Sequence, residues 1–415
     1  MSDPKSESPA GPAEGASPVP DADASPAQSA SASPAGAAAA SASPAESARA
    51  SASVAGAVTM TADAAPPPGG PAGSEGHGPA GSEGQGRGDA QVRRAPVVLG
   101  PLARLGQARH LGLVAALVLL AIVGLVTVPE NFATTSNLVS ILSLAATIGV
   151  ITVGATFVII GGGIDLSVGA VMALASVWAT TLATQAYGPL VMIVCAVLVG
   201  AAAGLVNGFL IAYGRMVPFI ATLAMLVAAR GLAQRMSDRR TQLVQQGNEM
   251  IVELSTTRVL GVPVLVYIFA LVVVVGWVVL NRTTFGRRTY AVGGNPEAAR
   301  LAGINVRRHT MLLYALSGLC CGIAAVLIMA RTTTGSSTHG DLYELDAIAA
   351  VIIGGTLLTG GRGSIIGSIL GLLIFTVITN LFILNGLNTS DQLIAKGLII
   401  VVAVLLQRRS LESRT

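Results

Sequence analysis

Charged side chains are scarce in this sequence of 415 residues. Asp, Glu, Lys and Arg together make up 11% of it, while 52% of the residues are hydrophobic and the mean hydropathy is +0.69. Soluble globular domains carry a charge at about a quarter of their positions. The composition therefore excludes a soluble globular protein and predicts an all-α, multi-pass protein of the cell membrane, with the lipid bilayer as its main solvent.

Lysine is almost absent, and its positions exclude one kind of chemistry. It occurs only at Lys5 and Lys396, and neither lies in a G-x-x-x-x-G-K-[ST] loop that could hold nucleotide phosphates. The H-E-x-x-H and G-x-S-x-G motifs are also missing. We expect no enzyme activity, no cofactor, no metal site and no nucleic-acid partner, so ATP-driven transport would need a motor on another chain.

Cysteine is also rare and does not form a recognisable framework. Cys195, Cys320 and Cys321 all lie in apolar runs, without C-x-x-C spacing. Adjacent residues point about 100° apart on a helix, which argues against a joint metal site at Cys320 and Cys321. We interpret the three cysteines as small core residues.

Large apolar side chains are nearly missing from residues 1–95, which consist mainly of Ala, Ser, Pro and Gly. Such a segment cannot bury enough apolar surface to offset the entropy of ordering. The sequence predicts a disordered cytoplasmic tail over 1–95, followed by a membrane domain over 96–410.

The membrane domain contains ten apolar segments that are candidates for crossing the bilayer. They lie near residues 111–128, 138–160, 165–184, 189–213, 217–236, 263–280, 309–330, 346–358, 363–384 and 392–407. The eighth is so short that it could instead be re-entrant. Ten crossings place fifteen arginines on the cytoplasmic side and five outside, and this bias favours ten crossings with both termini in the cytoplasm.

A cytoplasmic loop at 281–308 contains the pattern of a short, capped helix, "NPEAARLAG". Asn295 can cap it, Pro296 suits the first helical position, Glu297 complements the positive end of the helix dipole, and Gly303 can take the left-handed stop. Two turns of helix are marginal in water and need a packing surface. That surface could be the membrane interface or the groove of a partner, and sequence physics alone favours the interface.

The stretch "GGGIDLSVG" interrupts an apolar run with an aspartate. Gly161, Gly162 and Gly163 weaken a helix and allow a turn. Asp165 can then cap the next helix by accepting the N–H groups of Ser167 and Val168. We favour this structural role over direct gating, although both can hold because broken backbone is tolerated where it lines a cavity.

A similar interruption follows Asp346, where Gly354 and Gly355 break the eighth segment. Close helix packing through small residues is the simpler interpretation. Arg230 and Lys396 lie within apolar segments. Arg230 must snorkel to the outer surface or pair with another group, and we favour snorkelling; for Lys396 we favour an interfacial anchor over a substrate contact.

Four stretches of the sequence together resemble the membrane permease of ribose-type ABC sugar importers. They are "GGGIDLSVGAVMALA", "VNGFLIAYGRMVPFIATLAMLVAARGL", "TTFGRRTYAVGGNPEAARLAGINV" and "YELDAIAAVIIGGTLLTGGRGSIIGSILG". The resemblance spans residues 111–407 in order and spacing, while the tail is longer than is usual in that family. It implies a type II importer fold with glycine-interrupted helices, and import of a monosaccharide such as ribose, xylose or galactose.

The resemblance also implies roles and partners. The cytoplasmic loop would carry the helix that couples to an ATPase subunit, formed by Gly294, Asn295, Pro296, Glu297, Ala298, Arg300 and Gly303. The translocation pathway would include Gly161, Gly162, Gly163, Asp165, Ser167, Asp346, Gly354 and Gly355. Aromatic residues are only 4% of the chain, which argues against a tight sugar-stacking pocket. Selectivity would then rest on an extracytoplasmic sugar-binding protein that docks on loops 237–262 and 331–345 of a homodimer.

Two other transport classes compete with this interpretation. An ion-coupled secondary transporter also uses broken helices, but it usually needs ionisable groups deep in the bilayer, whereas Asp165 and Asp346 lie near segment ends. A passive channel would need a ring of polar or charged residues, and the sequence shows no such ring.

Overall fold

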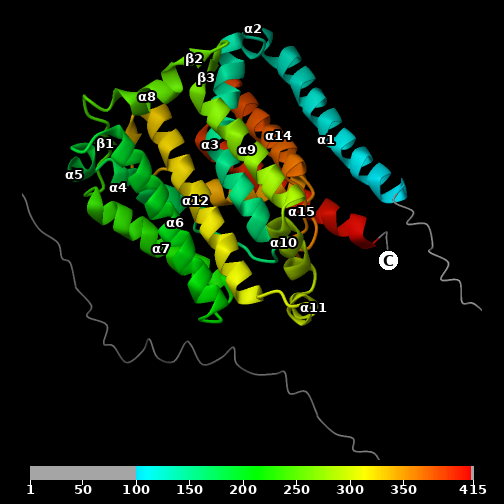
Figure 1. Cartoon of the computed structure of the whole chain (residues 1–415). Coiled ribbons are helices and arrows are strands. Elements are labelled where there is room, and N and C mark those ends of the chain that lie inside the picture. Colours follow the sequence, from blue (N-terminus) through cyan, green and yellow to red (C-terminus); the bar gives the residue numbers. More distant parts are fainter. Residues whose placement is uncertain (1–99, 413–415) are drawn as a thin grey trace, which may run out of the picture. The chain divides into compact units, whose positions relative to one another are not determined.

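The computed structural model describes residues 100–412, and the side chains of 110–402; the predicted tail lies outside the described residues. The chain is helical over most of this range (Figure 1). The long helices are α1 (Gly100–Thr127), α3 (Thr135–Ile160), α6 (Pro189–Ala212), α7 (Pro218–Met236), α9 (Val264–Arg282), α12 (Val306–Thr332), α14 (Ile365–Leu384) and α15 (Thr389–Glu412). The shorter helices are α2 (Pro129–Phe132), α4 (Val168–Ala179), α5 (Leu182–Gln185), α8 (Glu249–Thr256), α10 (Thr284–Gly294), α11 (Pro296–Leu301) and α13 (Tyr343–Ile353).

Seven of the described helices are long and apolar enough to cross a membrane: α1 from His110, α3, α6, α7, α9, α12 and α14. The segments predicted near 165–184 and 346–358 form only α4 and α13, of 12 and 11 residues. At 1.5 Å per residue these helices are about 17 to 18 Å long, against a hydrocarbon core of about 30 Å. Neither helix is long enough to cross that core alone; α4 is followed by α5 and α13 by irregular backbone, and the count of ten crossings stays a prediction.

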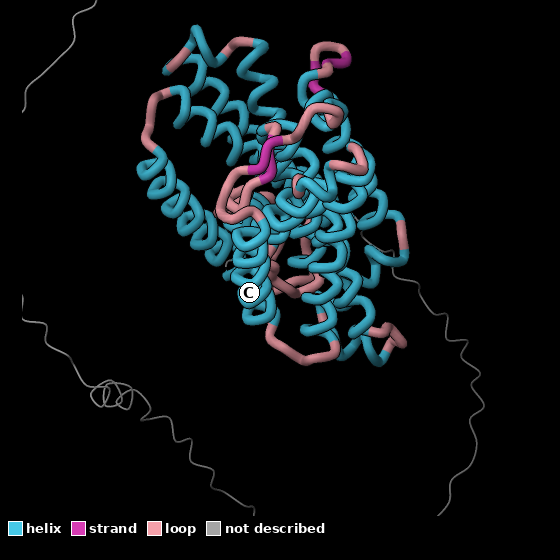
Figure 2. The backbone as a smooth tube through the Cα atoms, turned by 90° about the vertical axis from the view of Figure 1, so that its left-hand side faces the viewer, coloured by secondary structure: helices cyan, strands magenta, loops and turns pink. Residues whose placement is uncertain are grey.

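The two ends of the membrane domain carry different elements. Figure 1 places α8 with β2 (Arg258–Val259) and β3 (Val262–Pro263) at one end and α11 at the other; we call these the α8 end and the α11 end. β2 pairs antiparallel with β3, and β1 (Gln242–Leu243) pairs antiparallel with β4 (Thr334–Gly335). Figure 2 shows how small these strands are beside the helices. The all-α prediction therefore holds for the membrane segments.

The core forms around α12, which packs most extensively against α6 and then against α3. Four glycines let α6 and α12 approach closely: Gly200 and Gly204 of α6 meet Gly318 and Gly322 of α12. A Cβ on Gly318 would lie 2.2 Å from the carbonyl oxygen of Gly200. Small residues at helix crossings in membranes allow this backbone approach. Cys320 and Cys321 are buried in the same core, which confirms them as core residues.

We expect Gly318→Val to destabilise the membrane domain by about 1 to 3 kcal/mol or more, because backbone rather than a movable side chain occupies the space. The matched control is Gly231→Ala in α7, where nothing lies within 4 Å of the added carbon. Thermal unfolding in detergent measures both. Equal melting temperatures for the two variants would refute the close-packing account.

Candidate translocation and coupling sites

Asp165 is held in the irregular segment 161–167 between α3 and α4. Its Oδ1 accepts the Ser167 N–H at 3.0 Å and the Ser167 hydroxyl at 2.7 Å, and its Oδ2 accepts the Ser317 hydroxyl at 2.9 Å. Asn207 extends the network by donating its Nδ2 to the Ser167 hydroxyl at 2.9 Å. All four side chains are buried. The network ties the broken segment to α6 and α12.

This geometry refines the predicted capping role. The bond from the Ser167 N–H is present as expected, but Ser317 of α12 supplies the next bond that the sequence assigned to Val168. Ser167 itself occupies the N-cap position of α4 and makes no side-chain cap bond there. Asp165 therefore connects two elements distant in sequence as well as ordering its own turn.

Asp346 lies in the first turn of α13 and forms an ion pair with Lys396 of α15. Lys396 Nζ lies 3.0 Å from Asp346 Oδ2 and 3.3 Å from Oδ1, and it also sits 5.4 Å from the ring centroid of Phe375. The two side chains are 19% and 9% exposed. The interpretation of Lys396 as an interfacial anchor is therefore wrong, because it neutralises a carboxylate between two helices.

Arg230 is likewise paired, and the prediction that it snorkels is wrong. It donates hydrogen bonds to the carbonyl oxygens of Ser337 and His339 and forms an ion pair with Asp341 at 2.8 Å. These partners lie in the loop 333–342 at the α8 end, so Arg230 fastens α7 to that loop. Burial and the nearby arginines Arg331 and Arg230 lower the pKa of His339 to about 4, so its ring is neutral at pH 7.

The predicted short helix exists as α11 and ends as the sequence indicates. Asn295 Oδ1 accepts the Ala298 N–H at 3.0 Å, Pro296 is in the first turn, and Gly303 has a φ of 82°. Glu297 and Arg300 form an exposed ion pair at 3.0 Å. α10 precedes α11 and was not predicted; Thr283 caps it by accepting the Gly286 N–H at 3.4 Å.

Backbone from three segments meets at glycines beside α11. The Gly361 N–H donates to the carbonyl oxygen of Ile160 at 2.8 Å. A Cβ on Gly293 would lie 1.8 Å from the same oxygen, and one on Gly360 would lie 2.7 Å from the Gly293 oxygen and 2.9 Å from Gly162 Cα. We call this contact of Gly162, Gly293, Gly360 and Gly361 the glycine junction. It joins the end of α3, the α10–α11 turn and the loop that follows α13.

A cavity of about 380 Å³ opens beside the glycine junction. It is lined by predicted pathway residues Gly161, Gly162 and Gly163 and by predicted coupling residues Gly294 and Pro296. The two predicted sets are thus neighbours. Gly354 and Gly355 lie apart from this cavity lining: a Cβ on Gly354 would meet the Gly367 oxygen of α14 at 2.3 Å, which agrees with close packing, and Gly355 has a φ of 92°.

Sequence reasoning missed Asn207 and Ser317 as partners of Asp165, and Lys396 as the partner of Asp346. Each is a polar residue inside an apolar helix, next to a glycine. That signal marks a buried polar position but does not say which partner it meets.

The seven long apolar helices define a multi-pass membrane protein. Comparison with known proteins identifies it as a transport subunit. Residues 137–404 match the family described as "Branched-chain amino acid transport system / permease component". The ribose import permease protein of Bacillus subtilis (strain 168) is 40% identical over 279 residues, covering 67% of this chain and 87% of that protein. That of Escherichia coli (strain K12) is 39% identical over 300 residues, covering 72% and 92%.

Other relatives carry other cargo names. The galactose/methyl galactoside import permease protein of Escherichia coli (strain K12) is 36% identical over 321 residues, covering 71% of this chain and 92% of its own. No solved structure matches the chain. The chain belongs to this family of transport-system permease components, and within it to the ribose-type ABC sugar importer permeases. The resemblance drawn from its motifs is confirmed.

Removing one partner of the Asp346–Lys396 pair leaves a buried charge without compensation. We expect Lys396→Met to lower stability by about 3 to 5 kcal/mol, and the double variant Asp346→Leu with Lys396→Met to recover most of it. Thermal unfolding in detergent checks this. A double variant no more stable than the single one would show that the pairing is not the cause.

Asp165→Ala removes the acceptor for three donors at once, and we expect a loss of several kcal/mol because each unpaired buried group costs about 1 to 3 kcal/mol. Asp391→Ala, in the first turn of α15 and exposed, is the control. The comparison again uses melting temperatures. If Asp165→Ala has the same melting temperature as the control variant, the network does not hold segment 161–167.

Proposed function

We infer that this chain is the membrane permease of an importer that carries a monosaccharide such as ribose, xylose or galactose and takes its energy from a separate ATPase subunit. The importer would also need an extracytoplasmic sugar-binding protein, and two copies of this chain would form the pore. The observation that carries this proposal is α11, a capped helix of six residues presented at one end of the membrane domain.

α11 has the properties of a docking element rather than of a packed helix. Only Ala299 among its residues is buried, and Leu301 is 79% exposed. Glu297 and Arg300 add a charge of each sign beside this apolar side chain. So short a helix is marginal without a packing surface, and the groove of a nucleotide-driven partner would provide it.

The glycine junction supplies a route from α11 to the broken helices. Backbone contacts leave no side chains to bend, so a displacement of the α10–α11 turn moves Gly162 and Gly361 directly. Gly162 lies in segment 161–167, which precedes α4, and Gly361 lies in the loop that follows α13. We propose that both short helices respond to one movement of this turn, as alternating access would need.

The α8 end supports the proposed contact with a binding protein. β1 and β4 pair loop 237–262 with loop 333–342, and Arg230 fixes the second loop to α7. The α8 and α11 ends are opposite (Figure 1), as a binding protein outside and an ATPase inside would need. We propose that the α11 end faces the cytoplasm, in agreement with the arginine bias, and that both chain termini lie on the same side of the membrane.

An ion-coupled mechanism finds less support. Asp165 accepts hydrogen bonds from two hydroxyls and an N–H, and Asp346 forms an ion pair with Lys396. Both carboxylates therefore have structural partners. The cargo rests on the relatives, whose names include ribose, galactose, fructose and allose; the family description names branched-chain amino acids instead, so the family alone does not fix the cargo.

Charge inversion on α11 tests the coupling role. We expect Glu297→Lys and Arg300→Glu each to reduce ATP-dependent sugar uptake by at least roughly tenfold, the effect of about 1.4 kcal/mol at the docking surface, without changing the melting temperature. Vesicles containing the chain, its ATPase and its binding protein would be assayed with labelled ribose, xylose and galactose. Asp391→Lys, exposed in the first turn of α15 and outside both α11 and the two proposed docking loops, is the control for charge.

Two results would refute the proposal. Normal uptake by both α11 variants would exclude α11 as the coupling helix. Uptake that follows an ion gradient without ATPase and binding protein would exclude the importer mechanism altogether.

A further inference from the structure

Two cavities follow one another along one face of α12. The first, of about 400 Å³, lies towards the α11 end and is lined on α12 by Arg308, His309 and Leu312. The second, of about 230 Å³, is lined farther along by Leu316, Leu319 and Ile323. Positions 308, 312, 316, 319 and 323 are three or four residues apart, so they share one helix face.

The second cavity is an apolar groove between α9 and α12. Its floor comes from Val153 and Phe157 of α3, which packs against both walls. Leu271 and Val275 of the α9 wall are 63% and 51% exposed. The groove offers hydrocarbon contact and no charged group, at a depth where the surrounding solvent is lipid.

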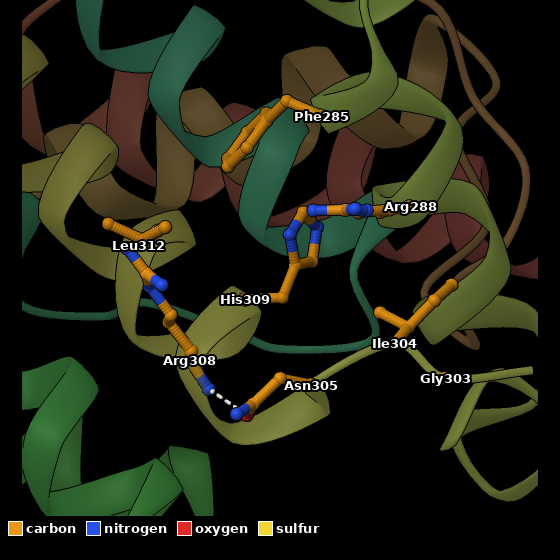
Figure 3. A pocket seen from close by; sticks show the side chains of 8 residues that line it. All are labelled: Phe285, Arg288, Gly303, Ile304, Asn305, Arg308, His309 and Leu312. Atoms are coloured by element: carbon orange, nitrogen blue, oxygen red, sulfur yellow. Dashed lines mark hydrogen bonds between the residues drawn. The ribbon is translucent and has the colours of Figure 1, made fainter. Parts of the chain in front are cut away.

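The first cavity adds positive charge to this groove. Figure 3 shows Arg288 of α10 beside the ring of His309, and Arg308 on the α12 side of the cavity. The ring centroid of Phe285, also from α10, lies 4.7 Å from that of His309. Within residues 110–402 neither Arg288 nor Arg308 forms an ion pair. Phe285 links the two cavities, because its ring centroid lies 6.1 Å from that of Phe157 in the groove floor.

We propose that the two cavities together bind one anionic phospholipid, with its phosphate at Arg288 and Arg308 and an acyl chain in the α9–α12 groove. Guanidinium groups suit phosphate oxygens because they donate in a planar fork. From Arg308 to Ile323 the helix rises about 22 Å, which covers one leaflet, about 15 Å of a 30 Å core. The site is independent of the cargo and of the ATPase.

The bound lipid would sit against the element that precedes the coupling helix. α10 contributes Phe285 and Arg288, and the loop between α11 and α12 contributes Gly303 and Ile304 to the same cavity. An anionic headgroup would thus neutralise charge on both flanks of α11. The lipid would hold α10 and α12 together at the membrane surface.

Lipid titration of the full chain in detergent tests the headgroup contact. The probes are phosphatidylglycerol and phosphatidylcholine, and native mass spectrometry counts bound lipid. We expect phosphatidylglycerol to be preferred, and the double variant Arg288→Gln with Arg308→Gln to bind it roughly 25-fold more weakly, about fivefold for each arginine. The matched control is Arg307→Gln, an exposed neighbour that does not line the cavity.

A second variant tests the acyl chain. Leu319→Trp fills the groove and should reduce phosphatidylglycerol binding by roughly tenfold or more, the effect of losing about two buried CH₂ groups, whereas Leu198→Trp, exposed on α6, should leave it unchanged. Melting temperatures without added lipid show whether each variant is folded, and inorganic phosphate serves as a headgroup without a chain.

Several outcomes would overturn the site. If Arg307→Gln weakens phosphatidylglycerol binding as much as the double variant does, the lipid is attracted by the general positive charge of the surface and not by this site. Inorganic phosphate competing as well as lipid would indicate a free-anion pocket. Unchanged phosphatidylglycerol binding by folded Leu319→Trp would exclude the groove as the acyl-chain site. If this variant instead changes its oligomeric state without losing lipid, a second copy of the chain covers α9 and α12.

Discussion

The backbone of segments 161–167 and 354–364 sets the main constraint on this structure. At membrane depth a peptide group without a hydrogen-bond partner costs several kcal/mol, so irregular backbone survives only where protein satisfies it. Asp165 meets this need by accepting the Ser167 N–H, and Ile160 meets it by accepting the Gly361 N–H. Asp165 also accepts the Ser317 hydroxyl of α12. The two broken helices can exist because their breaks are bonded to α12 and to the end of α3.

Glycine and charge act in opposite ways in this membrane domain. Glycines allow backbone to touch backbone, at the α6–α12 crossing and at the glycine junction. The buried charges instead hold elements in register. Asp346 with Lys396 holds α13 to α15, and Arg230 holds α7 to the loop 333–342. The glycine junction lies towards the α11 end, the α6–α12 crossing lies near the middle of both helices, and the Arg230 cluster lies at the α8 end.

Several features were predictable because they are local in sequence. The apolar segments gave the seven long helices, and the Asn295, Pro296 and Gly303 pattern gave α11, since capping depends on residues within one turn. The glycines before Asp165 correctly marked a break. Two local readings were wrong. Arg230 and Lys396 were assigned to the membrane surface because snorkelling needs no partner, whereas their partners lie 107 and 50 residues away in the chain.

The sequence by itself determined that this is a multi-pass membrane protein with broken helices and a short capped helix, because composition, motifs and caps are short-range properties. Only the tertiary structure decided which polar groups meet: Asp165 with Ser317 and Asp346 with Lys396. It also decided that the glycines after α3, in α10 and in the loop after α13 come into contact. It also aligned the arginines of α10 and α12 with an apolar groove. The physical reason is that burial is defined by neighbours distant in sequence, and burial is what makes a partner for a charge, or a close backbone contact, necessary.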